Sequence, residues 1–246
     1  MTLVEHLDEL RTRIIICIAV LVVAMSFCFW QNEALLDIAN DPVPEDVRVG
    51  GLITLGPAEA FTTTITLSAY FAILLALPVI LYQAYAYVLP AFSREEKRAI
   101  LPLVLLAPGL FLAGVLFAYF VVMPPAIDFL VNFNDDSFNN QLRARDYYTF
   151  FATMLIALGL IFEVPLAILA VCRLGIVTPD QLAANRRYAI LVIAVVAALL
   201  PSIDPVTLIL EIVPIYILFE LSILLARFLG APATVAEEAE SPPREP

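Results

Sequence analysis

Long apolar runs separated by short polar segments form the dominant pattern along this chain. The runs cover approximately residues 14–30, 61–89, 100–123, 147–172, 188–200 and 206–228. A helix needs about 20 mainly apolar residues to cross a hydrocarbon core of about 30 Å. The runs lack the period-two alternation that is typical of membrane β-barrel strands. The pattern therefore predicts an all-α membrane protein with six transmembrane helices.

The segment before the first run has a different pattern. In residues 2–13, Leu3, Leu7 and Leu10 recur at helical spacing among acidic and basic residues. This arrangement predicts a short amphipathic helix that lies along the membrane surface. The run at 14–30 is not followed by a small-residue cleavage site, and an acidic helix precedes it, so we expect it to be retained as the first span rather than removed as a signal peptide.

The fifth run is unusually short. Only 13 residues, Tyr188–Leu200, precede a turn that contains Pro201, Asp204 and Pro205. A helix of that length reaches about 20 Å, which is less than the thickness of the hydrocarbon core. We therefore expect a short fifth helix, with Asp204 lying below the membrane surface where water enters or the bilayer thins.

Polar segments mark the predicted loops and the tail. Residues 32–61 are broken by proline, aspartate and a glycine pair, and they form the first predicted extramembrane loop. A second such segment begins at Pro124-Pro125 and ends near Asp146. Residues 231–246 are rich in proline and glutamate and are predicted to be disordered. The remaining residues, 1–230, form one predicted transmembrane domain.

The composition narrows the class of protein. With 62% hydrophobic and 15% charged residues, the chain has too little polar surface for a water-soluble globule. Its formal net charge of −11 makes it unsuited to binding nucleic acid, which requires a basic surface. The cysteines, Cys17, Cys28 and Cys172, lie in or at the ends of apolar runs, and their spacing indicates packing rather than a disulfide framework.

The distribution of basic residues predicts the orientation. Six spans place both termini on one side of the membrane, and lysine and arginine are enriched in cytoplasmic loops. Of the 13 basic residues, only Arg48, Arg143 and Arg145 fall on the side opposite the termini. We therefore expect both termini to be cytoplasmic.

The sequence contains no pattern typical of an enzyme. Its one histidine, His6, lies in the amphipathic segment with no serine or cysteine nucleophile beside it. The spacing of His, Cys and acidic residues does not match a metal site, and the glycine patterns of nucleotide-binding loops do not occur. We expect no catalytic site, metal or cofactor.

Glu163 is a carboxylate near the middle of the fourth apolar run. An ionisable group at that depth costs about 2.5 kcal/mol or more on insertion scales, so it requires an explanation. One interpretation is a protonated, hydrogen-bonded residue that only fixes helix packing. The other is a functional polar site.

Two further carboxylates are predicted at the cytoplasmic end of the bundle. Glu9 lies one turn before the first span, and Glu96 lies in the polar loop between the second and third spans. If the fold brings them together, they form a receptor for guanidinium groups, which carboxylates bind bidentately. The alternative is that Glu9 pairs with Arg13 at i+4, and Glu96 with a neighbouring base, as surface charges commonly do.

Several motifs resemble those of one known family. His6-Leu7-Asp8-Glu9-Leu10-Arg11-Thr12-Arg13 resembles the amino-terminal His-Leu-x-Glu-Leu-Arg-x-Arg signature of TatC, the large subunit of the twin-arginine protein translocase. Further similar motifs follow in the family's order: Pro57-Ala58-Glu59-Ala60-Phe61, residues 78–83, Pro90-Ala91-Phe92 with Glu96-Lys97-Arg98, residues 117–120, Phe162-Glu163-Val164-Pro165, residues 186–188, and Pro214-Ile215-Tyr216 with Phe219-Glu220. The resemblance covers nearly the whole chain except its tail.

This resemblance implies a concave bundle of six helices with cytoplasmic termini and short fifth and sixth helices. It implies that Glu9 and Glu96 recognise the paired arginines of a signal peptide. Arg11 and Arg13 would support that surface. Glu163 would face the concave groove.

The resemblance also implies partners and a location. The family works with single-span TatA and TatB subunits, in an oligomeric complex of the prokaryotic plasma membrane, to move folded proteins on the proton-motive force. Asp204 would close the hairpin between the fifth and sixth helices. The candidate partner contacts are Glu59, Phe61, Glu211 and Glu220.

Some positions depart from the family's pattern. Ser93 stands where relatives commonly have an aromatic residue. Pro201 and Leu208 stand where some members carry polar residues that contact a partner helix. These departures concern the details of the partner site.

Two other function classes fit parts of the pattern. A proton-coupled small-solute transporter would use Glu163 as its proton carrier, but such transporters often contain paired internal repeats, and the two halves of this sequence show no convincing repeat. A passive membrane scaffold would tolerate loss of any of these carboxylates.

Overall fold

The computed structural model describes residues 3–88, 94–133, 141–173, 175–201 and 204–228, with only the backbone described at 3–4, 46, 49–50, 88, 94–100 and 102–103. Regular structure in these ranges is helical, apart from one parallel bridge between Ile53 and Arg143. Five of the described helical segments are long and apolar enough to cross a membrane: residues 5–30, 59–87, 104–132, 144–173 and 205–228. The shorter helix α10 (Arg186–Leu199) corresponds to the fifth predicted span.

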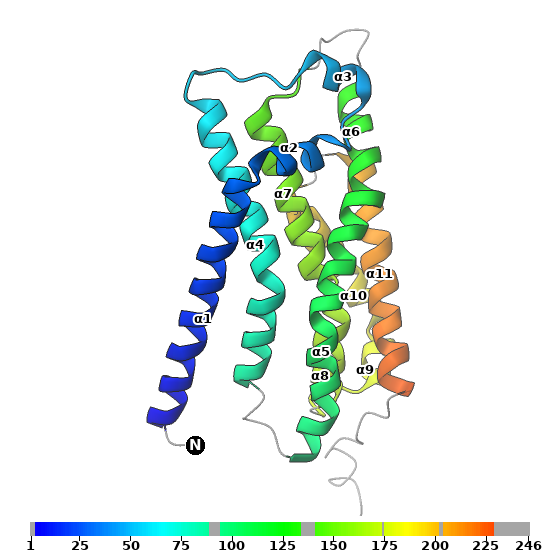
Figure 1. Cartoon of the computed structure of the whole chain (residues 1–246). Coiled ribbons are helices and arrows are strands. Elements are labelled where there is room, and N and C mark those ends of the chain that lie inside the picture. The colour runs from blue at the N-terminus through cyan, green and yellow to red at the C-terminus, as the bar shows by residue number, and fades with distance from the viewer. Residues whose placement is uncertain (1–2, 89–93, 134–140, 174, 202–203, 229–246) are drawn as a thin grey trace, which may run out of the picture.

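The first span is one continuous helix. α1 (Leu3–Trp30) contains no glycine or proline that would stop it, and it packs along α4 (Glu59–Val88) (Figure 1). The expectation of a separate surface helix at residues 2–13 is therefore wrong over the described part. The charged residues of that segment instead extend α1 by about three turns beyond its apolar run.

The first predicted loop contains two short helices, α2 (Asn32–Asn40) and α3 (Glu45–Gly50). Tyrosine hydroxyls fix the end of α2. Tyr119 donates to the Ile38 carbonyl at 3.0 Å, Tyr147 to the Ala39 carbonyl at 2.5 Å, and Tyr148 to Asn40 Oδ1 at 2.9 Å. The last carbonyls of a helix lack partners within the helix, so these bonds both cap α2 and anchor it over the bundle.

The third span continues further than the sequence predicted. α5 (Arg94–Phe117) passes through a π-helical turn, η2 (Ala118–Val122), into α6 (Met123–Asn132). The expected loop at Pro124-Pro125 is wrong, because both prolines lie in the first turn of α6. Proline is tolerated there, since the first amides of a helix have no acceptor within it.

The fourth span is divided where a single helix was expected. α7 (Ala144–Ile161) ends at a turn formed by Phe162 and Glu163, and α8 (Val164–Arg173) follows. The Glu163 amide donates to the Leu160 carbonyl at 3.1 Å, one residue short of the α-helical acceptor. Pro165 has no amide hydrogen to donate to the Ile161 carbonyl, so the α-helical hydrogen-bond ladder lacks a bond at this point.

The last spans form a hairpin. A short helix, α9 (Pro179–Ala184), leads into α10, whose 14 residues confirm the short fifth helix. α11 (Pro205–Phe228) has 24 residues and continues through Pro214. At about 36 Å it is long enough to cross the membrane, so the expectation of a short sixth helix is wrong. The predicted tail, 231–246, lies outside the described residues.

α7 lies at the centre of the packing. Phe151, Met154 and Leu158 are fully buried on it. Two glycines allow α5 and α7 to approach closely: a Cβ on Gly114 would lie 2.8 Å from the Leu158 carbonyl oxygen, and one on Gly159 would lie 2.6 Å from the Phe111 ring. The crossing positions the turn at Glu163, which follows α7 directly.

Figure 1 shows which helix ends lie together. The start of α1, the ends of α4 and α8, and the end of α11 lie at one end of the bundle (Figure 1). We call this the terminal end. α2, α3 and the start of α7 lie at the opposite end.

Candidate functional site

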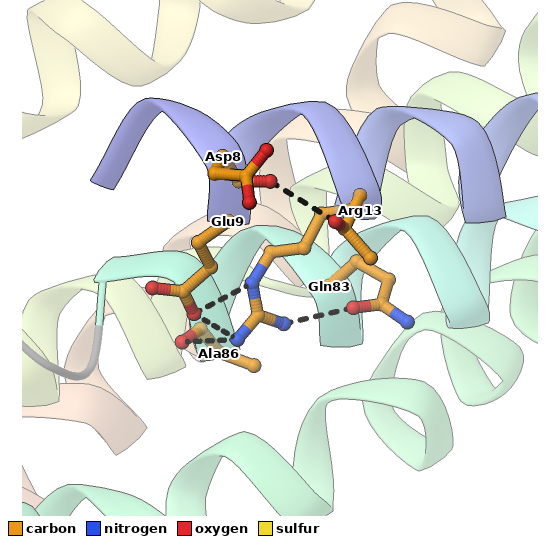
Figure 2. Close-up of polar contacts among 6 residues, drawn as sticks. Asp8, Glu9, Arg13, Gln83 and Ala86 are labelled. Carbon is orange, nitrogen blue, oxygen red and sulfur yellow. Dashed lines mark hydrogen bonds and ion pairs between the residues drawn. The ribbon is translucent and has the colours of Figure 1, made fainter. Parts of the chain in front are cut away.

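Glu9 and Arg13 form a cluster at the terminal end, between α1 and α4 (Figure 2). The Arg13 guanidinium donates to Glu9 Oε1 through Nε at 3.0 Å and through Nη2 at 2.5 Å. It also reaches α4, donating to Gln83 Oε1 at 2.8 Å and to the Ala86 carbonyl at 3.1 Å. Arg13 therefore joins the two helices while it holds Glu9 in one orientation.

The cluster is half-buried, and one of its acceptors is unused. The side chains of Arg13 and Glu9 are 22% and 20% exposed. Within the part of the chain that the structure describes, the buried Glu9 Oε2 has no hydrogen-bond partner. The expected i+4 pairing with Arg13 is thus present, but it uses only Oε1. A buried carboxylate oxygen without a donor is unfavourable, so this atom is suited to receive one from a ligand.

The neighbouring residues contribute unequally. His6 stacks on Tyr87 of α4 with ring centroids 4.4 Å apart, which strengthens the contact between α1 and α4. Arg11 is exposed, outside the contacts that bind Arg13. The side chain of Glu96 lies outside the described residues, so its approach to Glu9 remains a prediction; its backbone lies in the first turn of α5.

Glu163 lies buried at the junction of α7 and α8. Tyr85 of α4 donates a hydrogen bond to Glu163 Oε2 at 3.3 Å. Among the described residues, Glu163 Oε1 is buried without a hydrogen-bond partner. One Glu163 oxygen therefore accepts a hydrogen bond from α4, as the packing interpretation expects, and the other has no donor among the described residues. Whether Glu163 is a functional polar site stays a prediction.

Asp204 lies between α10 and α11, at the hairpin that the resemblance expected it to close, and it makes a capping contact that was not predicted. Its Oδ1 accepts from the Thr207 amide at 2.8 Å, and its Oδ2 accepts from the Thr207 hydroxyl at 2.6 Å. Asp204 thus caps the start of α11, with Pro205 at the first helical position. The sequence Asp-Pro-Val-Thr contained this signal.

The four candidate partner contacts do not form one surface. Glu59 is buried and binds Arg143 at 2.6 Å at the opposite end, and this hydrogen bond raises the pKa of Arg143. Phe61 is exposed, whereas Glu211 is fully buried. Glu220 accepts two hydrogen bonds from Arg186 near the terminal end. Glu59 and Glu220 therefore stabilise contacts between helices of this chain.

The described residues contain no group of three His, Cys, Asp or Glu side chains that could hold a metal ion. Sequence reasoning also missed the roles of Gln83 and Ala86, although Gln83 ends one of the motifs quoted above. Their contacts with Arg13 join positions 70 and 73 residues apart, a separation at which helical periodicity carries no information.

Comparison with known proteins identifies the family. Residues 5–214 match the family described as Sec-independent protein translocase protein (TatC). The chain belongs to the TatC family. It is 36% identical to TatC of Aquifex aeolicus over 236 residues, covering 95% of this chain and 96% of that one. It is 35% identical to TatC of Escherichia coli K12 over 228 residues, covering 92% and 88% of the two chains.

Solved TatC structures share the fold. A crystal structure of the twin-arginine translocase receptor TatC superimposes with a TM-score of 0.77 at 34% identity, covering 91% of this chain and 99% of that one. A second, in detergent, gives a TM-score of 0.78 at 35% identity. TatC is therefore confirmed as the family, with its six-helix membrane fold and its role as a non-enzymatic, multi-pass subunit of a protein translocase.

Proposed function

We propose that this TatC chain is the receptor subunit of a twin-arginine translocation system, and that Glu9 binds a guanidinium group of the signal peptide. The observation that carries the proposal is the buried Oε2 of Glu9, which has no partner among the described residues, beside an Oε1 that Arg13 already holds. A peptide arginine would supply the missing donor.

Arg13 is the positioning residue of this site. Its bonds to Gln83 and Ala86 fix the guanidinium between α1 and α4, so Glu9 is held in place before the peptide arrives. A planar guanidinium presents several N–H donors in a fixed fork, whereas a lysine ammonium is a strongly hydrated point charge. The site therefore favours arginine over lysine. Glu96 is the proposed acceptor for the second arginine, and Arg11 a supporting residue.

The remaining steps extend along the bundle. Glu163, buried at the α7–α8 turn, would contact the inserted peptide or a partner helix through Oε1. The proposed partners are single-span TatA and TatB subunits, in an oligomeric complex that moves folded proteins on the proton-motive force. The terminal end would face the cytoplasm. Residues 1–230 would act as one transmembrane domain in the prokaryotic plasma membrane.

The test measures binding of a fluorescent twin-arginine peptide to the purified full chain in detergent. Glu9→Gln keeps the size of the side chain but removes its charge. We expect it to weaken binding by about 10-fold or more, as for a hydrogen bond to a charged group. Asp8→Asn is the matched control, because the Asp8 side chain is exposed. The contact of Asp8 in this region is made by its backbone oxygen, which accepts a hydrogen bond from the Thr12 hydroxyl at 3.0 Å.

A twin-lysine peptide provides the second comparison. It should bind weakly to the unmodified chain, and Glu9→Gln should change that weak binding little. Equal affinities of Glu9→Gln and Asp8→Asn for the twin-arginine peptide would contradict the assignment of Glu9.

A further inference from the structure

A groove lies between the start of α10 and the end of α11, at the terminal end. Its volume is about 410 Å³. Its polar lining residues are Arg186, Tyr216, Glu220 and Arg227. Ile217, Leu221 and Leu224 are exposed, and they follow one another at helical spacing along α11. In a membrane span, such residues form a wall that faces lipid chains.

Arg186 lies at one side of the groove and is held firmly. It donates to both carboxylate oxygens of Glu220, at 2.6 and 3.0 Å, and Glu220 also accepts from the Tyr216 hydroxyl at 2.9 Å. These bonds use Nε and Nη2 of the guanidinium. Among the described residues Nη1 makes no hydrogen bond, and about half of the side chain is exposed. Its remaining donors can therefore bind another anion.

Arg227 also lines the groove and is held loosely. It donates to Asp180 Oδ1 at 2.8 Å, but its side chain is 50% exposed and that of Asp180 is 87% exposed. Exposed pairs of this kind contribute little and exchange readily. Arg227 can therefore leave Asp180 for a better acceptor at little cost.

The surroundings add positive charge to a chain whose formal net charge is −11. Arg187 follows Arg186 directly, is exposed, and lies 4.7 Å above the Tyr188 ring. Arg173 ends α8 at the same end of the bundle. Of these arginines, Arg186 and Arg227 line the groove itself, together with the carboxylate of Glu220.

We propose that this groove binds an anionic phospholipid. Arg227 and Arg186 hold the headgroup phosphate, and an acyl chain lies along Ile217, Leu221 and Leu224. A soluble anion would use only the arginines, and a neutral lipid would use only the apolar wall. The two features together fit a molecule that carries a phosphate and a hydrocarbon chain at the depth where a span meets the headgroups. The site is separate from Glu9 and does not depend on the receptor proposal.

The test uses the purified, delipidated full chain and native mass spectrometry. Dioleoyl phosphatidylglycerol and dioleoyl phosphatidylcholine share their acyl chains but differ in net charge. We expect the chain to retain phosphatidylglycerol with about 5-fold or greater preference. Arg227→Gln should reduce that affinity by about fivefold, as for one basic residue at an anionic membrane surface. Arg227→Lys should retain more of it.

Arg48→Gln is the matched control, since it removes one exposed arginine at the opposite end, in α3. It should bind phosphatidylglycerol as the unmodified chain does. Thermal unfolding of each variant in detergent verifies that it is folded. The double variant Arg186→Gln with Glu220→Gln tests the contribution of Arg186 without leaving the Glu220 carboxylate unpaired.

Four results would overturn the proposal. Equal retention of the two lipids, or equal loss of phosphatidylglycerol in Arg227→Gln and Arg48→Gln, would exclude a specific charged site in this groove. Displacement of phosphatidylglycerol by equimolar inorganic phosphate would instead indicate a simple anion site, with no role for the apolar wall. Displacement only by a single-span partner subunit would assign the groove to a protein helix.

Discussion

Gly114→Ala should destabilise the protein by disturbing the crossing of α5 and α7. The new Cβ would lie 2.8 Å from the Leu158 carbonyl oxygen and 2.8 Å from Cβ and Cγ of Phe162. The Leu158 oxygen belongs to the backbone and Phe162 Cβ is bonded to it, so rotation of a side chain cannot remove these two contacts. The end of α7 must therefore move, and with it the turn that carries Glu163.

The magnitude follows from two opposing effects. Overpacking of a dense interior costs about 1–3 kcal/mol, and the rigid obstacles here place the cost near the upper part of that range. Replacing a helical glycine with alanine returns about 0.5–1 kcal/mol. The net loss should be about 1–2 kcal/mol. For a chain of this size, that corresponds to a fall of about 2–8 °C in the unfolding midpoint.

Gly109→Ala is the control, because it changes the same residue type in the same helix. A Cβ at Gly109 would meet no other atom within 4 Å, so only the helical gain remains. Circular dichroism during heating in detergent should show a lower midpoint for Gly114→Ala and an unchanged or slightly higher one for Gly109→Ala. If Gly114→Ala matched the control, the close approach would not limit the packing and the reasoning would fail.

Three further outcomes concern the carboxylates. Glu163→Ala should impair transport of a twin-arginine precursor into membrane vesicles more than it impairs peptide binding; weak binding with normal export of what is bound would reverse that order. Asp204→Ala should lower stability by about 0.5–2 kcal/mol in the same thermal assay, because it removes the cap of α11, while Asp204→Asn should retain most of it. Arg143→Gln should destabilise by about 1–3 kcal/mol, since it leaves the buried Glu59 without its charged partner. Adding Glu59→Gln should recover part of that loss, and a strictly additive double variant would show that the pair is not coupled.

The sequence predicts the spans of this bundle better than their ends. Apolar runs mark the hydrocarbon core directly, because few polar residues can lie there. The errors fall where a residue has two possible roles. Pro124-Pro125 was interpreted as the start of a loop, but proline also suits the first turn of a helix, as in α6. Pro214 lies inside α11, and the helix continues through it. Neighbouring groups can compensate for a missing amide within a membrane bundle.

The candidate site was predicted in part. Glu9 and its pairing with Arg13 follow from i+4 spacing on one helix. The bonds from Arg13 to Gln83 and Ala86 depend on how α1 lies against α4, which local spacing cannot supply. The sequence Asp-Pro-Val-Thr at 204–207 indicates the capping role of Asp204. That role was not predicted, because Asp204 was interpreted from its expected depth in the membrane.

The turn between α7 and α8 has a consequence for how its chemistry can be altered. Pro165 has no amide hydrogen to donate to the Ile161 carbonyl, and the Glu163 amide donates to the Leu160 carbonyl at 3.1 Å. The Ile161 carbonyl oxygen therefore lacks its α-helical donor close to the Glu163 carboxylate. Side-chain replacement at Glu163 removes one polar group and leaves that main-chain oxygen in place. A scan of side-chain substitutions would therefore understate how polar the α7–α8 turn is. Only a change such as Pro165→Ala, which restores an amide donor to the helix, could reduce the contribution of the main-chain oxygen.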